Sequence, residues 1–174
     1  TNCRVQRVET RPEFVQVVTS RDERVLARTV VLACGVTFRF HGMLQSRLPS
    51  PVLHTAQIEL DATPAEKLEI HFGRQVAPEG FAWLVPVRRA GRTRLKAGVL
   101  LRGDARAHLR RFLAHPGIAS RLTDGVAEPI RRILPLGPAQ RTYGRRMLAV
   151  GDAAGLTKPV TGGGIFYSLL SGQF

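Results

Sequence analysis

A glycine-rich segment near the end of the chain, VGDAAGLTKPVTGGGIFYSLL at residues 150–170, restricts the fold more than any other part of the sequence. An apolar run precedes the glycines and a helix-like pattern follows them, which predicts a strand, a glycine-rich turn and a helix. Glycines at such a turn let a ligand come close to the backbone, and the free N–H groups at a helix start favour an anionic group. Spacing alone leaves two interpretations open: a site for a nucleotide-like anion, and a plain joint between strand and helix.

Individual residues near these glycines favour the nucleotide-like ligand. Asp152 comes at the end of the apolar run, where a carboxylate can accept hydrogen bonds from ligand hydroxyls, as an acid at a strand end does for a ribose. Pro159 stiffens the approach to the glycines. A second run, TVVLACG, is apolar on both sides as a buried parallel strand is, and Gly35 at its end permits a tight turn or a close approach by a ligand.

Two kinds of pattern alternate along the chain and predict two domains. Residues 1–48 and 140–174 have the pattern of an α/β layer, whereas residues 49–139 have the pattern of an antiparallel sheet with one helix, inserted between them. The predicted helix begins at Asp104, a residue suited to cap it, and ends at Pro116. The predicted strands span residues 5–10, 14–19, 25–33, 53–60, 68–72, 81–87, 94–100 and 147–150.

The net charge is +13, and nearly all of the positive charge comes from arginine. A basic module that binds nucleic acid is one interpretation, and single arginines scattered over a solvated surface are the other. The aromatic residues are few and are not interleaved with the arginines as a base-stacking platform requires. The spacing therefore favours the surface interpretation and no nucleic-acid partner, although a phosphate-bearing ligand would be attracted to such a surface.

Cysteines and histidines predict neither a disulfide framework nor a metal site. The two cysteines stand alone, and the five histidines show no ligand spacing, so we expect a reduced, cytoplasmic setting. No run of 18 apolar residues indicates a membrane span, and no signal peptide is visible. Because the chain opens on Thr1 and stops at Phe174 inside a helix-like pattern, we expect a piece of a longer protein.

The glycine-rich segment also resembles a known motif. GDAAGLTKPVTGGGI resembles the second flavin motif of FAD-dependent oxidoreductases with the p-hydroxybenzoate-hydroxylase type of fold, and its continuation, KPVTGGGIFYSLLSG, is most similar to the geranylgeranyl reductase family. The resemblance implies an α/β (α+β) fold: a partial FAD-binding Rossmann-like domain with an inserted antiparallel substrate domain. The N-terminal G-x-G-x-x-G unit of the family is absent from these 174 residues and is expected upstream of Thr1.

Carried over residue by residue, the resemblance implies two groups of site residues and no catalytic side chain. VVLACG resembles the strand that passes near the FAD adenosine, and GFAWLVPV resembles a segment of the substrate domain. The implied FAD-binding residues are Gly35, Gly151, Asp152, Ala153, Ala154, Gly155, Pro159, Thr161, Gly162, Gly163 and Gly164. The candidates for lining an apolar substrate tunnel are Phe81, Trp83 and Leu84, with plain strand core as the equal alternative.

The resemblance further implies a reductase that delivers hydride from reduced FAD to an isoprenoid double bond. It implies NAD(P)H or ferredoxin as the electron donor, and a lipid-like substrate that leaves peripheral contact with a membrane open. The nearest rival is a flavin monooxygenase of the same fold, but such enzymes usually carry a histidine where this chain has Gly155. An inactive fragment and a basic nucleic-acid-binding module remain as alternatives.

Overall fold

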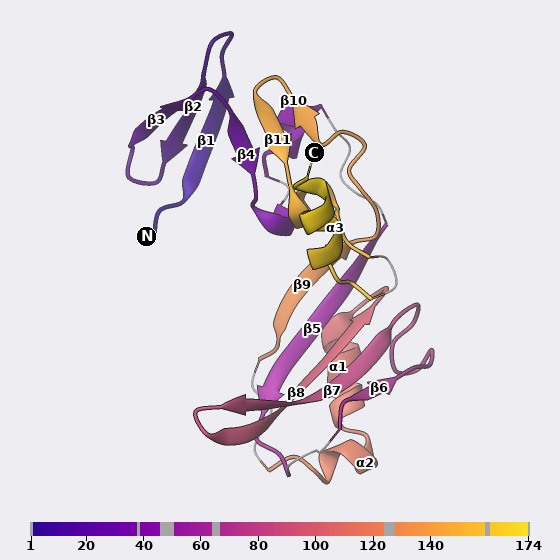
Figure 1. The fold of residues 1–174 in the computed structure, drawn as a ribbon. Helices are drawn as coiled ribbons and strands as arrows, with labels where there is room; N and C mark the ends of the chain where they lie inside the picture. Colours follow the sequence, from indigo (N-terminus) through magenta and orange to yellow (C-terminus); the bar gives the residue numbers. More distant parts are fainter. Residues whose placement is uncertain are drawn as a thin grey trace. The chain divides into compact units, whose positions relative to one another are not determined.

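The structure is a computed structural model and describes residues 2–37, 39–45, 51–63, 67–123, 128–158 and 161–173. The chain divides into two compact units, one formed by Thr1–Pro51 together with Pro135–Phe174 and the other by Val52–Leu134 (Figure 1). Strands dominate both units, and short helices accompany them. The mixed α/β class predicted from the sequence is confirmed.

The first unit begins with an antiparallel three-stranded sheet. Its strands are β1 (Val5–Thr10), β2 (Val15–Thr19) and β3 (Arg24–Ala27), in the order β1-β2-β3. Val15 of the central strand is fully buried and contributes to the core of this unit. Val5 and Val8 of β1 pack into this same core although they are three positions apart, because the register shifts between Val5 and Arg7. The strict alternation predicted for β1 is therefore interrupted.

The expected single strand over residues 25–33 is in fact two strands in different sheets. After β3 the chain leaves the first sheet, and β4 (Val30–Leu32) pairs in parallel with β11 (Met147–Ala149), which is also bonded to β10 (Tyr143–Gly144). The side chain of Arg146 donates to the Arg28 carbonyl, and the Val30 N–H donates to the Arg146 carbonyl at 2.9 Å. Hydrogen bonds to a residue more than a hundred positions away thus break the run, which local sequence could not reveal.

The second unit is built on a five-stranded sheet in the order β6-β7-β8-β5-β9. Pairing of β6 with β7, of β7 with β8 and of β8 with β5 is antiparallel, as predicted. The β7–β8 hairpin turns at Ala90 and Gly91, both with positive φ, as a two-residue hairpin loop requires. The strands are β5 (Val52–Leu60), β6 (Glu69–His71), β7 (Phe81–Arg89), β8 (Arg92–Leu101) and β9 (Ile130–Pro135).

One face of this sheet is covered by α1 (Ala105–Leu113), which packs on β5 and β8 (Figure 1). Asp104 caps the helix as predicted, because its carboxylate accepts from the backbone N–H groups of Arg106 and Ala107. Pro116, expected only to end this helix, begins a second short helix, α2 (Pro116–Ala119), since proline suits the first turn. In the described part of the chain, no helix is long and apolar enough to cross a membrane.

Candidate functional site

Two glycine turns lie side by side in the first unit. The parallel strands β4 and β11 end in register at Leu32 and Ala149, and each runs on into a short 3₁₀ turn: η1 (Gly35–Thr37) and η3 (Gly151–Ala154). Gly35 has φ +61° and Gly151 has φ +57°, so both adopt the left-handed conformation that glycine permits. The two turns contact one another. The carboxyl ends of parallel strands are where α/β folds bind ligands.

The GDAAG turn is held in its shape by the protein itself. Ala153 and Ala154 are fully buried, and the N–H of Leu156 donates to the carbonyl of Gly151 at 3.1 Å. Gly155 has φ +72°, and a Cβ added there would lie 2.2 Å from the carbonyl oxygen of Gly137. Gly155 is therefore a glycine because the chain packs against it, independently of any ligand.

Asp152 projects a half-buried carboxylate from this turn. Within the described segments, this carboxylate has no hydrogen-bond or ion-pair partner. A Cβ at Gly164, the residue before α3 (Ile165–Ser171), would approach Oδ1 of Asp152 to 3.1 Å, so the missing side chain admits the carboxylate. A half-buried acceptor without a protein partner suits ligand hydroxyls.

The loop before α3 is closed by two backbone hydrogen bonds. The N–H of Lys158 donates to the Gly163 carbonyl at 3.0 Å, and the N–H of Gly162, which has φ +70°, donates to the Lys158 carbonyl at 2.9 Å. At Gly163 an added Cβ would meet only Thr161 Oγ1, at an ordinary 3.6 Å, and φ is not positive. Nothing that the structure describes thus requires glycine at this position.

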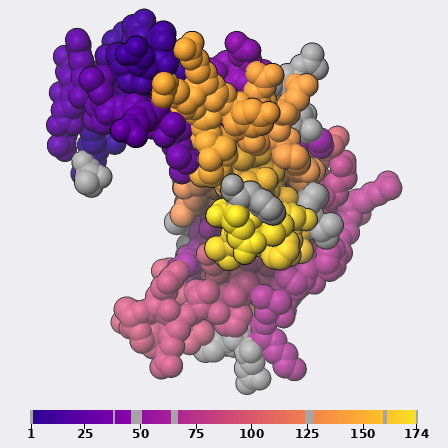
Figure 2. All heavy atoms as spheres, turned by 45° about the horizontal axis from the view of Figure 1, so that its top comes forward, coloured from indigo at the N-terminus to yellow at the C-terminus, as the bar shows by residue number. Residues whose placement is uncertain are grey.

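Two features around the loop change the sequence-based picture. Pro159 lies outside the described residues. The helix after the glycines has seven residues, and its start carries no side-chain cap, so its dipole is small and is not by itself an anion site. The side chains of α3 lie at the surface (Figure 2): Ile165 and Leu169 are 78% and 70% exposed.

A buried histidine that the sequence did not reveal supports the GDAAG turn. His41, in η2 (His41–Leu44), is completely buried, and its Nε2 bonds the carbonyl oxygen of Ala153. Because a carbonyl only accepts, this ring nitrogen carries a hydrogen and donates it. The two residues are separated by 112 positions, so no local pattern links them. We infer that His41 is a positioning residue for the turn that holds Asp152.

The three substrate candidates of the second unit do not share a face. Trp83 and Phe81 lie on one side of β7, with ring centroids 5.7 Å apart, whereas Leu84 is fully buried in the core with α1 on the other side. Leu84 is therefore corrected to a core residue, because successive side chains of a strand alternate between faces. Leu68, Ile70 and Phe72, which are 60%, 41% and 72% exposed, extend the aromatic side.

No family model matches this chain, but individual proteins resemble it. Digeranylgeranylglycerophospholipid reductase 1 of Methanopyrus kandleri is 31% identical over an alignment of 168 residues, and the match covers 86% of this chain and 42% of that protein. The digeranylgeranylglycerophospholipid reductase of Methanocaldococcus jannaschii is 31% identical over an alignment of 160 residues, and the match covers 85% of this chain and 40% of that protein. The chain thus spans 40–42% of the length of these relatives.

Solved structures share the fold. A geranylgeranyl bacteriochlorophyll reductase-like protein from Thermoplasma acidophilum matches with a TM-score of 0.73 and 20% identity, over 98% of this chain and 46% of that chain. A flavin-dependent halogenase from Brevundimonas sp. BAL3 matches with a TM-score of 0.61 and 21% identity, over 98% of this chain and 35% of that chain. The chain thus has part of the fold of these two proteins, and the partial fold predicted from the sequence is confirmed.

Proposed function

This chain belongs to the geranylgeranyl reductase family, and we propose that it is part of an FAD-dependent reductase acting on isoprenoid double bonds of a lipid. The observation that carries the proposal is the pair of adjacent glycine turns at Gly35 and Gly151, in which the Asp152 carboxylate lies beside Gly164 without a partner among the described residues. The substrate class comes from the two relatives, which are digeranylgeranylglycerophospholipid reductases.

The residues of the first unit fit a dinucleotide. Backbone N–H groups of the two glycine turns suit the anionic part, and the Asp152 carboxylate suits hydroxyls. An added Cβ would meet no atom within 4 Å at Gly35 and would make only an ordinary contact at Gly163, so both positions leave space for a ligand. We propose that Gly35, Gly151, Asp152 and the loop Thr161–Gly164 contact FAD, whereas Ala153, Ala154 and Gly155 maintain the shape of the turn.

The second unit supplies an apolar surface for an isoprenoid chain. We propose that Phe81 and Trp83, continued by Ile70 and Phe72, contact the substrate, since aromatic rings offer large apolar area and exclude water. When bound and reduced, by NAD(P)H or by ferredoxin, FAD supplies the hydride. The protein then contributes position and an environment from which water is excluded. A lipid substrate also leads us to propose contact with the membrane surface.

A flavin monooxygenase of the same fold is the second candidate, and one contact disfavours it. Such enzymes usually carry a histidine at the end of the GDAA sequence, whereas here the position of Gly155 has no room even for a Cβ beside Gly137. This close packing favours the reductase over the flavin monooxygenase.

Purification of the whole protein that contains this chain tests the proposal. We expect a yellow protein with a flavin absorption band. Replacing Asp152 by Asn should raise the Kd for FAD about 10-fold or more, because a hydrogen bond to a charged group contributes about 1.5–3 kcal/mol. Glu13→Gln, which removes the same charge from an exposed site in the first unit, should leave the Kd unchanged. A colourless protein that ignores added FAD would overturn the proposed function.

A further inference from the structure

A pocket lies wholly within the second unit, on the face of the sheet opposite the aromatic residues proposed above. It has a volume of about 910 Å³ and opens between β6, the loop over residues 74–78, and the helices α1 and α2. Its volume falls in the range of small-molecule sites, about 300–1,000 Å³. Nothing in the proposed reaction uses this pocket.

The pocket lies on the helix-covered face of the sheet. Glu69 and His71 of β6 pair with Leu84 and Ala82 of β7, and both of these partners are fully buried on the side of α1. Trp83, their neighbour in β7, points to the opposite face. A ligand in this pocket is therefore separated by the sheet from the aromatic surface proposed for the isoprenoid chain.

The charges around this pocket favour an anion. Arg74, Arg111 and Arg121 line it, with Glu69 as the one carboxylate among the lining residues. Glu69 is already engaged, because its oxygens lie 2.8 Å from Nη1 of Arg121 and 3.3 Å from Nε2 of His71. Arg74 and Arg111 are exposed, and within the described parts of the chain neither has a carboxylate partner. Two guanidinium groups thus remain available at the rim.

The floor of the pocket is apolar and ordered. Phe112 and Ile118 are 5% exposed and belong to the core, and the ring of His71 meets that of Phe112 edge-on with centroids 5.0 Å apart. His108 donates from Nδ1 to the Val76 carbonyl at 3.0 Å, which fixes its ring beside the loop. Cationic groups at the rim and apolar side chains below suit a ligand with an anionic head and an apolar body.

We propose that this pocket binds a phosphate ester with an apolar body, its phosphate held by Arg74 and Arg111. Arginine presents a planar fork of donors that matches phosphate oxygens two at a time. A free phosphate ester and the headgroup of an anionic lipid share this chemistry, and the two sources are separated by experiment. The proposal rests on the second unit alone and does not depend on flavin binding.

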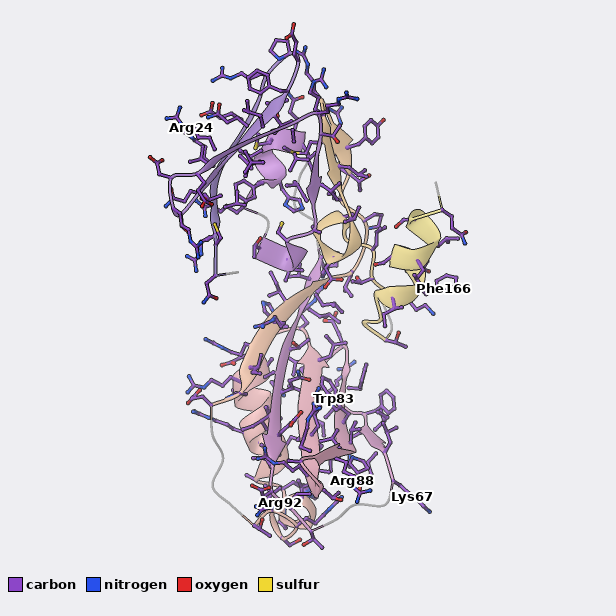
Figure 3. All side chains as sticks on the ribbon, turned by 60° about the vertical axis from the view of Figure 1, so that its left-hand side comes forward. Arg24, Lys67, Trp83, Arg88, Arg92 and Phe166 are labelled. Carbon is purple, nitrogen blue, oxygen red and sulfur yellow. The ribbon has the colours of Figure 1, made fainter. Side chains whose placement is uncertain are left out.

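Titration of the full chain with phenyl phosphate at fixed salt tests the pocket directly. We expect saturable binding, and we expect Arg74→Gln/Arg111→Gln to weaken it about tenfold or more, as loss of charge-assisted hydrogen bonds should. Arg111→Lys should weaken binding less, because it keeps the charge and loses the fork. The matched control is Arg88→Gln/Arg92→Gln, which removes two arginines of the β7–β8 hairpin (Figure 3) that do not line the pocket.

Vesicles separate the two sources of phosphate. If the source is a lipid, vesicles of phosphatidylglycerol should bind more tightly than vesicles of phosphatidylcholine, and only the Arg74→Gln/Arg111→Gln variant should lose the difference. If neither probe binds, or if both double variants lose binding equally, the attraction is a general property of the basic surface and the proposal is overturned. Unfolding midpoints measured by circular dichroism establish that each variant is folded.

Discussion

The indole of Trp83 lies directly over the backbone of Gly98, its partner across the β7–β8 pairing. A Cβ added to Gly98 would fall 2.2 Å from Cζ2 of the ring, which is closer than two carbon atoms can approach. Gly98 therefore sets the height at which the ring rests on the sheet. A glycine inside a strand commonly marks such a close approach.

Gly98→Ala should lift the Trp83 ring from the sheet and lower stability by about 1–3 kcal/mol, the usual effect of overpacking. Trp83 is the only tryptophan of the chain, so its fluorescence reports the displacement as a shift of emission to longer wavelength. Gly42→Ala is the matched control, since a Cβ there meets no atom within 4 Å. Unchanged emission together with unchanged stability would contradict the close contact.

Gly155→Ala and Gly163→Ala should affect different properties. The first should impair folding, and the second should impair flavin binding. Gly155→Ala should lower the free energy of unfolding by about 2 kcal/mol or more, because the new Cβ meets the Gly137 carbonyl and φ is +72°. Gly163→Ala should leave thermal unfolding nearly unchanged, since its Cβ has room, and should still weaken FAD binding in the whole protein.

Differential scanning calorimetry and flavin titration on the same samples compare the two glycine variants. If Gly163→Ala unfolds as early as Gly155→Ala does, its glycine serves the fold. If it retains FAD at full affinity, the loop does not approach the cofactor.

The sequence predicted features whose causes are local. Asp104 caps its helix because the acceptor and the N–H groups are neighbours in the chain, and the GDAAG turn follows its strand because glycine permits positive φ there. Features set by distant partners could not be predicted. The break between β3 and β4 depends on hydrogen bonds with Arg146, and the support of the turn depends on His41.

Leu84 illustrates a different limit. The resemblance implied neighbouring residues of one segment as substrate candidates, but a strand sends alternate side chains to opposite faces. Which face meets α1 is settled by the packing of Leu84 and Ala82 in the core, not by the motif.

The helix cap gives a pH-dependent prediction. The backbone N–H groups of Ala107 and then Arg106 donate to the Asp104 carboxylate and hold its pKa below its ordinary value. A lowered folded pKa means that the contribution to stability is present above the ordinary pKa and is lost as pH falls through the folded pKa. Asp104→Asn keeps a capping acceptor that does not titrate.

The wild-type protein should therefore lose stability relative to Asp104→Asn only as pH falls below about 4, the ordinary range of an aspartate. Unfolding midpoints measured by circular dichroism from pH 3 to pH 7 check the difference between the two proteins. A difference that stays constant across this range would show that ionisation of Asp104 does not couple to folding.

His41 connects the core of the first unit to the proposed cofactor site. Its ring is fully buried and donates from Nε2 to the Ala153 carbonyl, so His41→Ala leaves a cavity and an unsatisfied buried acceptor in the GDAAG turn. We expect a loss of about 1–3 kcal/mol in stability.

If His41 also positions Asp152, the Kd for FAD should rise in samples that calorimetry shows to be folded. Thr157→Val provides the comparison, because Thr157 is also buried and its hydroxyl donates to the Pro135 carbonyl instead of to the turn. Equal losses of stability with a change in FAD affinity only for His41→Ala would identify a positioning role, whereas parallel changes in both variants would reduce His41 to a residue of the core.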